Sequence, residues 1–182
     1  MAFDDRVREL PAGALERPLA LIGFMGVGKT TVASELARRL VCPMVDTDGL
    51  IESRAGRTIR ELFDWFGEAH FRELERTIIA ELDHASRQIV SLGGGAFMDA
   101  TTRALLLDRC TVVYLAAPWE YVRGTLRRIQ HSRPLLRGRS PSEIEGLFES
   151  RHPIYDQAHL RVLMAGRKPA QVAERILQLL QP

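Results

Sequence analysis

Lysine is scarce in this chain. The sequence holds 25 lysines and arginines in all, and only Lys29 and Lys168 are lysines. Cysteine is scarce too. Cys42 and Cys110 lie far apart and share no metal-ligand or redox spacing, which excludes a disulfide framework and a cysteine-based metal site. Each cysteine begins an apolar run, which is typical of a small buried residue in a reduced, cytoplasmic protein.

The chain also lacks a charge excess and a long hydrophobic run. The formal net charge is +2, which gives no reason to expect nucleic acid as a partner. No apolar stretch reaches the length needed to span a membrane, so we expect no membrane partner. Residues 1–18 contain four acidic residues and no apolar centre, unlike a signal or transit peptide. We expect this extension to be partly disordered or to add a helical turn.

The densest motif lies at residues 19–31, which read LALIGFMGVGKTT. A short apolar run ends at Gly23, and Lys29 and Thr30 stand directly before an amphipathic helical pattern. The spacing is G-x-x-x-x-G-K-[ST] between a strand and a helix. Its glycines let backbone N–H groups approach a polyphosphate, and the helix directs the positive end of its dipole at it. We predict a phosphate-binding loop, with Lys29 on the β- and γ-phosphates and Thr30 on Mg²⁺.

The alternative is a glycine-rich turn with an incidental lysine. The scarcity of lysine elsewhere argues against this alternative. A chain that uses arginine almost everywhere keeps lysine at the place where a compact ammonium suits a phosphate better than a planar guanidinium does.

Short apolar runs alternate with helical patterns along the rest of the chain. The runs lie at residues 19–22, 43–45, 88–92, 111–115 and 160–164. The helical patterns lie at residues 29–40, 50–55, 59–66, 68–86, 100–108, 118–128, 141–157 and 169–180. This alternation predicts an α/β fold in three layers, with a five-stranded parallel sheet flanked by helices. Ligands of such sheets bind beyond the carboxyl ends of the strands, so functional residues should follow each run.

Two carboxylates, Asp46 and Asp48, follow the second run. One could hold Mg²⁺ directly or through water, and the other could accept a hydrogen bond from a substrate hydroxyl. The third run lacks the terminal aspartate found in many P-loop proteins, so we assign the metal-supporting carboxylate to Asp46. The alternative is an N-cap pair for the next helix, and Asp48 suits that role.

Three consecutive glycines, Gly93, Gly94 and Gly95, follow the third run. They are costly in chain entropy and suit a place where the backbone donates N–H groups to a ligand. Earlier in the chain, Arg72 and Glu75 stand three residues apart in a helical pattern. The simplest interpretation of that spacing is an ion pair on a helix surface.

Arginines gather between residues 123 and 139, in a polar segment interrupted by proline and glycine. A solvated face would explain them. A kinase also needs a mobile arginine-bearing segment that shields the transferring phosphoryl group from water and adds charge at the transition state. Further on, Pro153 constrains the chain near Arg151, which could otherwise be a surface arginine. A turn at residues 166–169 could touch the nucleotide base.

Taken together, these residues resemble the shikimate kinase family, in the nucleoside-monophosphate-kinase-like branch of P-loop kinases, from about residue 19 to the C-terminus. The motifs that carry the resemblance are GFMGVGKTT from Gly23, Asp46-x-Asp48, Phe63, Gly67-Glu68-x-x-Phe71-Arg72-x-x-Glu75, Gly93-Gly94-Gly95-Ala96, Arg133-Pro134-Leu135-Leu136 and Arg151-x-Pro153-x-Tyr155.

The resemblance implies a role for each matching residue. The phosphates of ATP would be held by Gly26, Val27, Gly28, Lys29, Thr30 and Thr31. Thr30 would bind Mg²⁺, with Asp46 nearby through water. Asp48 would bind the reacting hydroxyl of shikimate as the candidate base, Arg72 and Arg151 its carboxylate, and Gly93–Gly95 would line the substrate. Arg133 would be the lid arginine that meets the phosphates. Arg127, Arg128 and Arg167 all remain candidates for the adenine contact.

The resemblance also implies an organisation. Residues 19–182 would form one kinase domain after the 1–18 extension, with a substrate-binding region at about 46–75 and a lid at about 127–140. The protein would be a cytoplasmic monomer.

Three other functions compete with this one. A gluconate kinase of the same fold also binds a carboxylate, so Arg72 and Arg151 alone do not exclude it; Asp48 and Gly93–Gly95 favour shikimate. A nucleoside monophosphate kinase would need a second base pocket. A non-catalytic nucleotide-binding module should have lost Lys29, Asp48 or Arg133.

Overall fold

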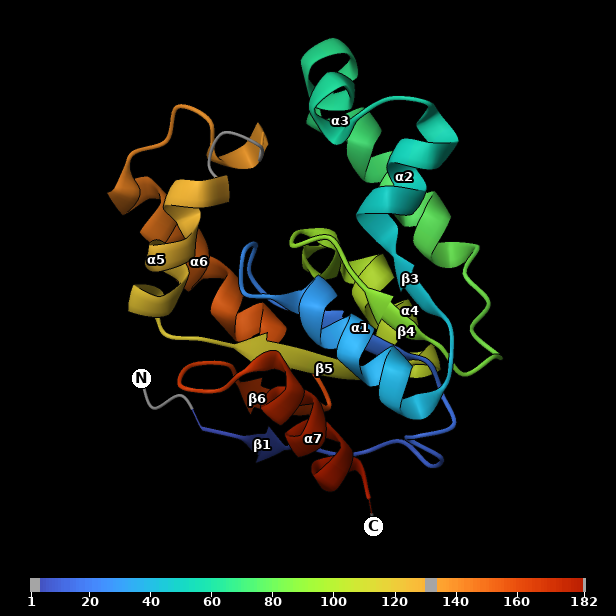
Figure 1. Ribbon diagram of the computed structural model, residues 1–182. Coiled ribbons are helices and arrows are strands. Elements are labelled where there is room, and N and C mark those ends of the chain that lie inside the picture. Colours follow the sequence, from blue (N-terminus) through green and yellow to red (C-terminus); the bar gives the residue numbers. More distant parts are fainter. Residues whose placement is uncertain (1–3, 130–133, 182) are drawn as a thin grey trace.

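The computed structural model describes residues 4–129 and 134–181, and for residues 127–129 it describes the backbone alone. One six-stranded sheet lies at the centre in the order β1-β6-β5-β2-β4-β3 (Figure 1). The strands are β1 (Arg6–Val7), β2 (Leu19–Ile22), β3 (Met44–Asp46), β4 (Ile89–Ser91), β5 (Thr111–Ala116) and β6 (Leu160–Leu163). The α-helices are α1 (Lys29–Leu40), α2 (Thr47–Ala55), α3 (Ile59–Ala80), α4 (Ala100–Arg109), α5 (Trp119–Ile129), α6 (Pro141–Tyr155) and α7 (Pro169–Leu180). Two 3₁₀ turns complete the elements, η1 (Ala96–Met98) and η2 (Pro134–Leu136).

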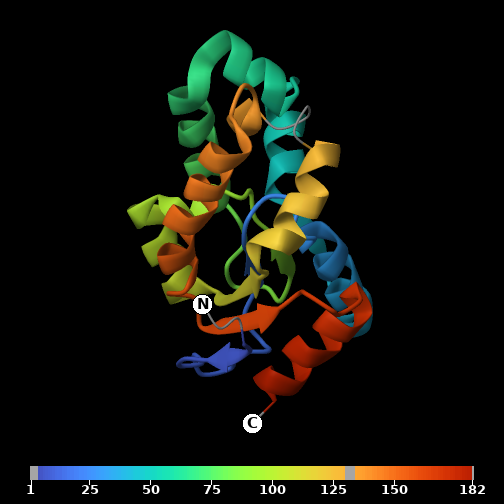
Figure 2. The ribbon, with the colours of Figure 1, turned by 90° about the vertical axis from the view of Figure 1, so that its left-hand side faces the viewer.

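Helices cover both faces of the sheet. Helices α1 and α7 lie on one face, and α4 and the C-terminal part of α6 lie on the other (Figure 2). The predicted three-layer α/β architecture is therefore confirmed. The sheet has six strands rather than five, because β1 pairs antiparallel with β6 through Arg6 and Val7. Part of the segment expected to be disordered or helical is therefore a strand, and two exposed residues are too few to show an alternating pattern in the sequence.

The central strands explain why their sequences read as continuous apolar runs. Every residue of β2 and β5 is buried, because helices cover both faces of this parallel sheet. Strand β2 lies between β5 and β4, so the phosphate-loop motif that follows it emerges at the middle of the carboxyl edge. The chemistry expected at strand ends is thereby brought to one edge of the sheet.

Helix α3 joins two segments that the sequence separates. Thr58 and Glu61 form a capping box at its start, where each side chain accepts the other's backbone N–H. Gly67 interrupts the helix with φ of 80° and ψ of 172°, but the chain resumes helical geometry beyond it. The predicted helices at 59–66 and 68–86 are thus one bent helix that ends at Ala80. Figure 1 shows α2 and α3 standing above the sheet on one side, and α5 and α6 on the other.

Replacing Gly23 with alanine should destabilise the fold. Gly23 has φ of +144°, and a Cβ placed there would lie 2.7 Å from the carbonyl oxygen of Leu115 on the neighbouring strand. Backbone strain and overlap of this kind cost about 1–3 kcal/mol. Urea denaturation followed by circular dichroism would measure the loss.

The matched control is Gly146→Ala on α6, where no described atom lies within 4 Å of the new Cβ. That change should raise the free energy of unfolding by about 0.5–1 kcal/mol, because alanine is the better helix former. Equal stability of Gly23→Ala and the wild type would contradict the expected close approach.

Candidate active site

The loop between β2 and α1 is shaped by glycines. Gly23, Gly26 and Gly28 have φ of 144°, 79° and 105°, in a region that side chains disfavour. Gly28 is the residue before α1, and among the described residues no side chain caps the first turn of that helix. The amides of this turn therefore face the loop, as an anion site at a helix start requires. The Nζ of Lys29 donates to the carbonyl oxygens of Gly23 and Phe24 at 2.9 and 3.2 Å.

Thr30 and Asp46 lie together at the edge of this loop. The Oγ1 of Thr30 donates to Oδ2 of Asp46 at 2.9 Å and lies 3.3 Å from Oγ of Ser91. The other carboxylate oxygen of Asp46 accepts the N–H groups of Asp48 and Gly49 at 3.1 and 3.4 Å. Asp46 is therefore the N-cap of α2, the role for which Asp48 was the alternative. Because Asp46 provides the cap, the side chain of Asp48 lines the neighbouring pockets.

Thr47, which the sequence analysis overlooked, ties α2 to the glycine loop. It is fully buried, and its Oγ1 donates to the Ser91 carbonyl at 3.3 Å. The same oxygen accepts the N–H of Gly93 at 3.0 Å. The residue between the two aspartates thus fixes the position of Asp48 relative to Gly93. Its position between two charged residues gave no sign of this role.

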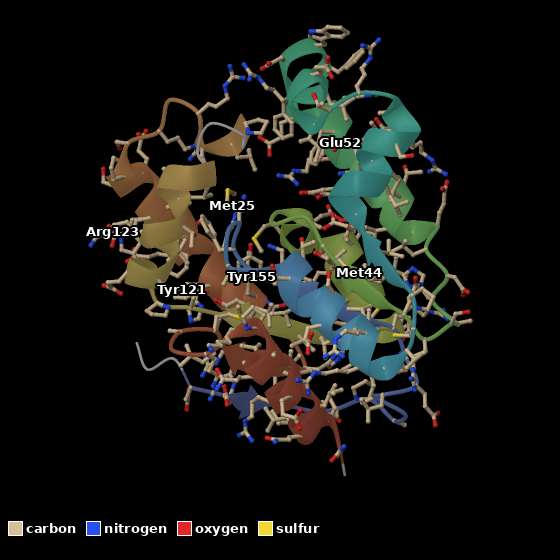
Figure 3. All side chains as sticks on the ribbon, in the orientation of Figure 1. Met25, Met44, Glu52, Tyr121, Arg123 and Tyr155 are labelled. Atoms are coloured by element: carbon tan, nitrogen blue, oxygen red, sulfur yellow. The ribbon has the colours of Figure 1, made fainter. Side chains whose placement is uncertain are left out.

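Beyond this edge lies a small pocket that opens to solvent. It is lined by Met25, Asp48, Ile59, Phe63, Phe71, Arg72, Glu75, Gly93, Gly94, Gly95, Pro134 and Leu135. Met25 lies at the tip of the phosphate loop, between the helices that rise on either side of the sheet (Figure 3). The pocket therefore combines apolar walls, a backbone floor and a few charged groups, as sites for small polar ligands do.

Arg72 and Glu75 form an ion pair in this pocket and not on the surface of the protein. The Nη1 of Arg72 lies 2.5 Å from Oε2 of Glu75, and its Nη2 lies 3.1 Å from Oε1 of Glu68. The side chain of Glu75 is only 3% exposed, and its Oε1 has no hydrogen-bond partner among the described residues. Burial raises the pKa of the Glu75 carboxyl, against the lowering effect of Arg72. The surface ion pair was the wrong interpretation, because helical spacing does not report depth.

Arg151 is the second cation of the pocket region. It is buried on α6, and its Nη1 donates to the carbonyl oxygen of Gly94 at 3.1 Å. The hydroxyl of Tyr155, one turn further, donates to the same carbonyl. These two bonds hold the middle of the glycine loop to α6, so Arg151 is not a surface arginine.

The three glycines leave room for the groups that pack on them. A Cβ at Gly93 would lie 2.7 Å from both Oδ1 of Asp48 and Oε1 of Glu75, and one at Gly95 would lie 2.5 Å from Nη2 of Arg72. A Cβ at Gly94 would lie 3.3 Å from the backbone nitrogen of Met25. Side chains of opposite charge therefore pack directly on this backbone.

A second, larger pocket lies over the phosphate loop. Its lining is Met25, Gly26, Gly28, Lys29, Thr30, Thr31, Asp46, Asp48, Ser91, Leu92 and Gly94. Met25, Asp48 and Gly94 line both pockets. The two cavities therefore adjoin, and Asp48 stands where they meet.

Several expected nucleotide contacts cannot be placed in these pockets. Arg133 lies outside the described residues, and so do the side chains of Arg127 and Arg128. Beyond that gap, Pro134 and Leu135 line the smaller pocket, and Nη1 of Arg137 lies 2.8 Å from Oδ1 of Asp64 on α3. The guanidinium of Arg167 lies on Asp5, at 2.8 and 3.0 Å.

The oxygen atoms of Thr30 and Asp46 are the groups of this loop that could bind a metal ion. Within residues 4–129 and 134–181 no three His, Cys, Asp or Glu side chains gather as a metal cluster. The Thr30 hydroxyl and the Asp46 carboxylate, 2.9 Å apart, are hard oxygen donors of the kind that Mg²⁺ prefers alongside phosphate oxygens. The donor set fits a metal held mainly by a nucleotide. In the same described part of the chain, no helix has the length and apolar character to cross a membrane.

Comparison with known proteins gives one consistent result. A family model described as shikimate kinase matches residues 25–181. The shikimate kinase of Oceanobacillus iheyensis is 36% identical over 166 residues, which cover 91% of each chain. That of Thermus thermophilus is 41% identical over 163 residues, which cover 89% of each chain.

Solved structures agree. Shikimate kinase from Acinetobacter baumannii, in complex with shikimate, aligns with a TM-score of 0.86 at 35% identity, covering 92% of this chain and 94% of that one. A gluconokinase from Sinorhizobium meliloti aligns with a TM-score of 0.51 at 16% identity, covering 90% of this chain and 91% of that one, and this shows likeness of fold alone.

Glu75→Gln should change how stability depends on pH. Burial raises the pKa of Glu75 in the folded protein above its ordinary value of 4.5, so the folded state holds this proton more tightly than the unfolded chain. The resulting stabilisation is fully present below pH 4.5 and is lost as the pH rises through the folded pKa. The free energy of unfolding of the wild type should therefore fall relative to that of E75Q as the pH rises from 4.5 towards neutrality.

Urea denaturation of both proteins across this pH range would measure the difference. Glu73→Gln, on the exposed face of the same helix, controls for the loss of one surface charge. A difference between wild type and E75Q that stays constant or grows with pH would contradict the effect of burial.

Proposed function

Because this chain belongs to the shikimate kinase family, we propose that its two adjoining pockets hold ATP and shikimate, so that the γ-phosphoryl group passes to the 3-hydroxyl of shikimate. The products are shikimate 3-phosphate and ADP. The observation that carries this division is the position of Asp48, which lines both pockets. A hydroxyl that binds Asp48 faces the end of a nucleotide seated on the phosphate loop.

On the nucleotide side, the backbone from Gly26 to Thr31 holds the phosphates and Lys29 supplies a positive charge at the β- and γ-phosphates. Thr30 would bind Mg²⁺, with Asp46 nearby through water, and the ion would offset phosphate charge. The support for this assignment is the glycine φ values, the uncapped start of α1 and the contact of Thr30 with Asp46. Lys29 bonds loop carbonyls at 2.9 and 3.2 Å, so its ammonium already lies on the loop where the phosphates bind.

On the acceptor side, Asp48 accepts the proton of the reacting hydroxyl and keeps its oxygen directed at the phosphorus. Arg72 and Arg151 bind the carboxylate of shikimate, and Gly93–Gly95 contribute backbone contacts. Paired guanidinium groups suit a planar carboxylate. Positioning and charge supply most of the catalysis, because phosphoryl transfer needs little covalent help from the protein.

Closure completes the site. Arg133 brings charge to the phosphates from the lid, about residues 127–140, and excludes water. One of Arg127, Arg128 and Arg167 contacts adenine. The reaction takes place within one domain, residues 19–182, whose substrate-binding region is about 46–75, in a cytoplasmic monomer with no nucleic-acid or membrane partner.

A substrate panel tests the acceptor. The protein is incubated with MgATP and, separately, with shikimate, gluconate and nucleoside monophosphates, and ADP release is measured. We expect shikimate alone to raise ADP release clearly above the level in buffer, because the carboxylate pair, Asp48 and Gly93–Gly95 together favour shikimate. Shikimate-dependent release no faster than in buffer would contradict the proposed function, and a response to gluconate in its place would favour the alternative kinase.

Arg72→Ala tests the carboxylate contact. A hydrogen bond to a charged group is worth about 1.5–3 kcal/mol, so the KM for shikimate should rise about tenfold or more. The KM for ATP should change less than about twofold. Arg60→Ala removes an exposed arginine from the same helix and should leave both constants unchanged. Equal increases in both KM values for Arg72→Ala would remove the assigned role.

A further inference from the structure

Asp5 is the most heavily bonded carboxylate among the described residues of the N-terminal segment. Its Oδ1 accepts the backbone N–H of Leu163 at 2.9 Å and Nη1 of Arg167 at 2.8 Å. Its Oδ2 accepts Nη2 of Arg167 at 3.0 Å and Nε of Arg175 at 2.9 Å. The Asp5 side chain is only 11% exposed. Four donors, three of them from two guanidinium groups, converge on one acid.

The strand pairing places this acid at the ligand edge of the sheet. Strand β1 runs antiparallel to β6, with Arg6 opposite Arg161 and Val7 opposite Leu160. The residue before Arg6 therefore reaches the carboxyl end of β6, where it caps the N–H of Leu163. The carboxyl edge is where the phosphate loop also lies.

The loop after β6 is fixed against the phosphate loop. The N–H of Met164 donates to the Ala116 carbonyl at 2.8 Å, and Cε of Met164 lies 3.2 Å from a Cβ placed on Gly28. The N–H of Arg167 donates back to the Met164 carbonyl at 3.2 Å. Arg167 is thus three residues along the chain from Met164, whose side chain lies beside Gly28, the residue before α1.

Asp5 fixes the plane of the Arg167 guanidinium. Both Nη atoms bond Asp5, and Nη1 also donates to the carbonyl of Leu163 at 3.1 Å. Bonds at its edge leave the flat faces of a guanidinium available, and 32% of this side chain is exposed. A guanidinium face is a good surface for a nucleotide base.

The carboxylate keeps its charge at any working pH. Burial alone would raise the pKa of Asp5, but hydrogen bonds from Arg167, the Leu163 N–H and Arg175 outweigh burial and lower the pKa to about 2. The anchor for Arg167 is therefore permanent and does not switch on and off with pH.

We infer that Asp5 is a positioning residue for the adenine nucleotide, acting through Arg167, whose guanidinium it holds at the carboxyl end of β6. The inference rests on the proposed function, in which Arg167 is one of three candidates for the adenine contact. It assigns a role in the kinase site to a segment that comes before the phosphate-loop domain. It also selects Arg167 from the three arginines that the sequence left open.

Asp5→Asn is the first test, with Asp4→Asn as its matched control. Asp4 is the adjacent acid of the same segment, and it bonds Arg161 rather than Arg167. ADP affinity is measured by isothermal titration calorimetry, and KM is measured for each substrate. D5N should weaken ADP binding and raise the KM for ATP about three- to tenfold, with the KM for shikimate within about twofold of wild type. D4N should match the wild type in all three quantities.

A double-mutant cycle with Arg167→Gln separates positioning from general weakening. If Asp5 acts through Arg167, the variant R167Q and the double variant D5N/R167Q should bind ADP equally. Unchanged ADP affinity in D5N overturns the inference. Tighter binding does so as well, because Asp5 would then be holding Arg167 away from the nucleotide. Equal increases in both KM values also overturn it.

A second variant of Asp5 and an activity measurement on the wild type complete the test. If D5N does not fold, Asp5→Glu retains the charge but displaces Arg167, and it should weaken ADP binding in the same direction. Shikimate-dependent ADP release by the wild type is measured first. Its absence would contradict the proposed function, whereas an active wild type with normal ADP binding in D5N contradicts only the role of Asp5.

Discussion

The ion pair between Arg72 and Glu75 lies where a helix, a glycine loop and a cleft meet. A buried carboxylate without a partner is costly, and Arg72 supplies the countercharge one turn away on α3. The pair needs space on both sides, which Gly95 gives to the guanidinium and Gly93 gives to the carboxylate. Without Arg72, the buried Glu75 carboxylate would face Asp48 with Arg151 as its remaining countercharge.

Ion pairs between distant parts of the chain hold the N-terminal segment to β6 and to the end of α6. Arg6 bonds Asp156 just after α6, and Arg161 on β6 bonds both Asp156 and Asp4. Helix α6 carries Arg151, which bonds the Gly94 carbonyl, so the N-terminal segment is connected to the glycine loop as well as to the loop after β6. The N-terminal segment is thus an integral part of the sheet.

Much of the fold follows from local patterns. Helices α1 and α7 and strand β2 begin and end at the residues that their periodicity predicts, and each begins beside a glycine or proline: Gly28 precedes α1, Pro18 precedes β2 and Pro169 opens α7. The phosphate loop is equally clear, since its glycines, Lys29 and Thr30 must be adjacent in sequence.

Other features depend on contacts that only the folded chain makes. Thr47 bonds residues 44 and 46 positions away, and β1 pairs with β6 from the other end of the chain. The depth of Glu75 is set by packing from outside its helix. Gly67 was interpreted as a break, yet one non-helical residue only bends α3. The sequence places Asp46 and Asp48 at the end of a strand but does not say which of them caps the next helix. The geometry of the turn shows that Asp46 caps α2 and that Asp48 lines the pockets.

The glycine loop has a consequence for how such a site can diversify. A Cβ added at Gly93 or Gly95 would lie within 3 Å of a charged side-chain end, so a substitution there would displace Asp48, Glu75 or Arg72 from its present position. The walls of the acceptor pocket differ, because Met25, Phe63 and Leu135 line it with apolar side chains. A change in the floor therefore acts on the charged groups that meet the ligand, whereas a change in the walls alters the size and polarity of the space around it.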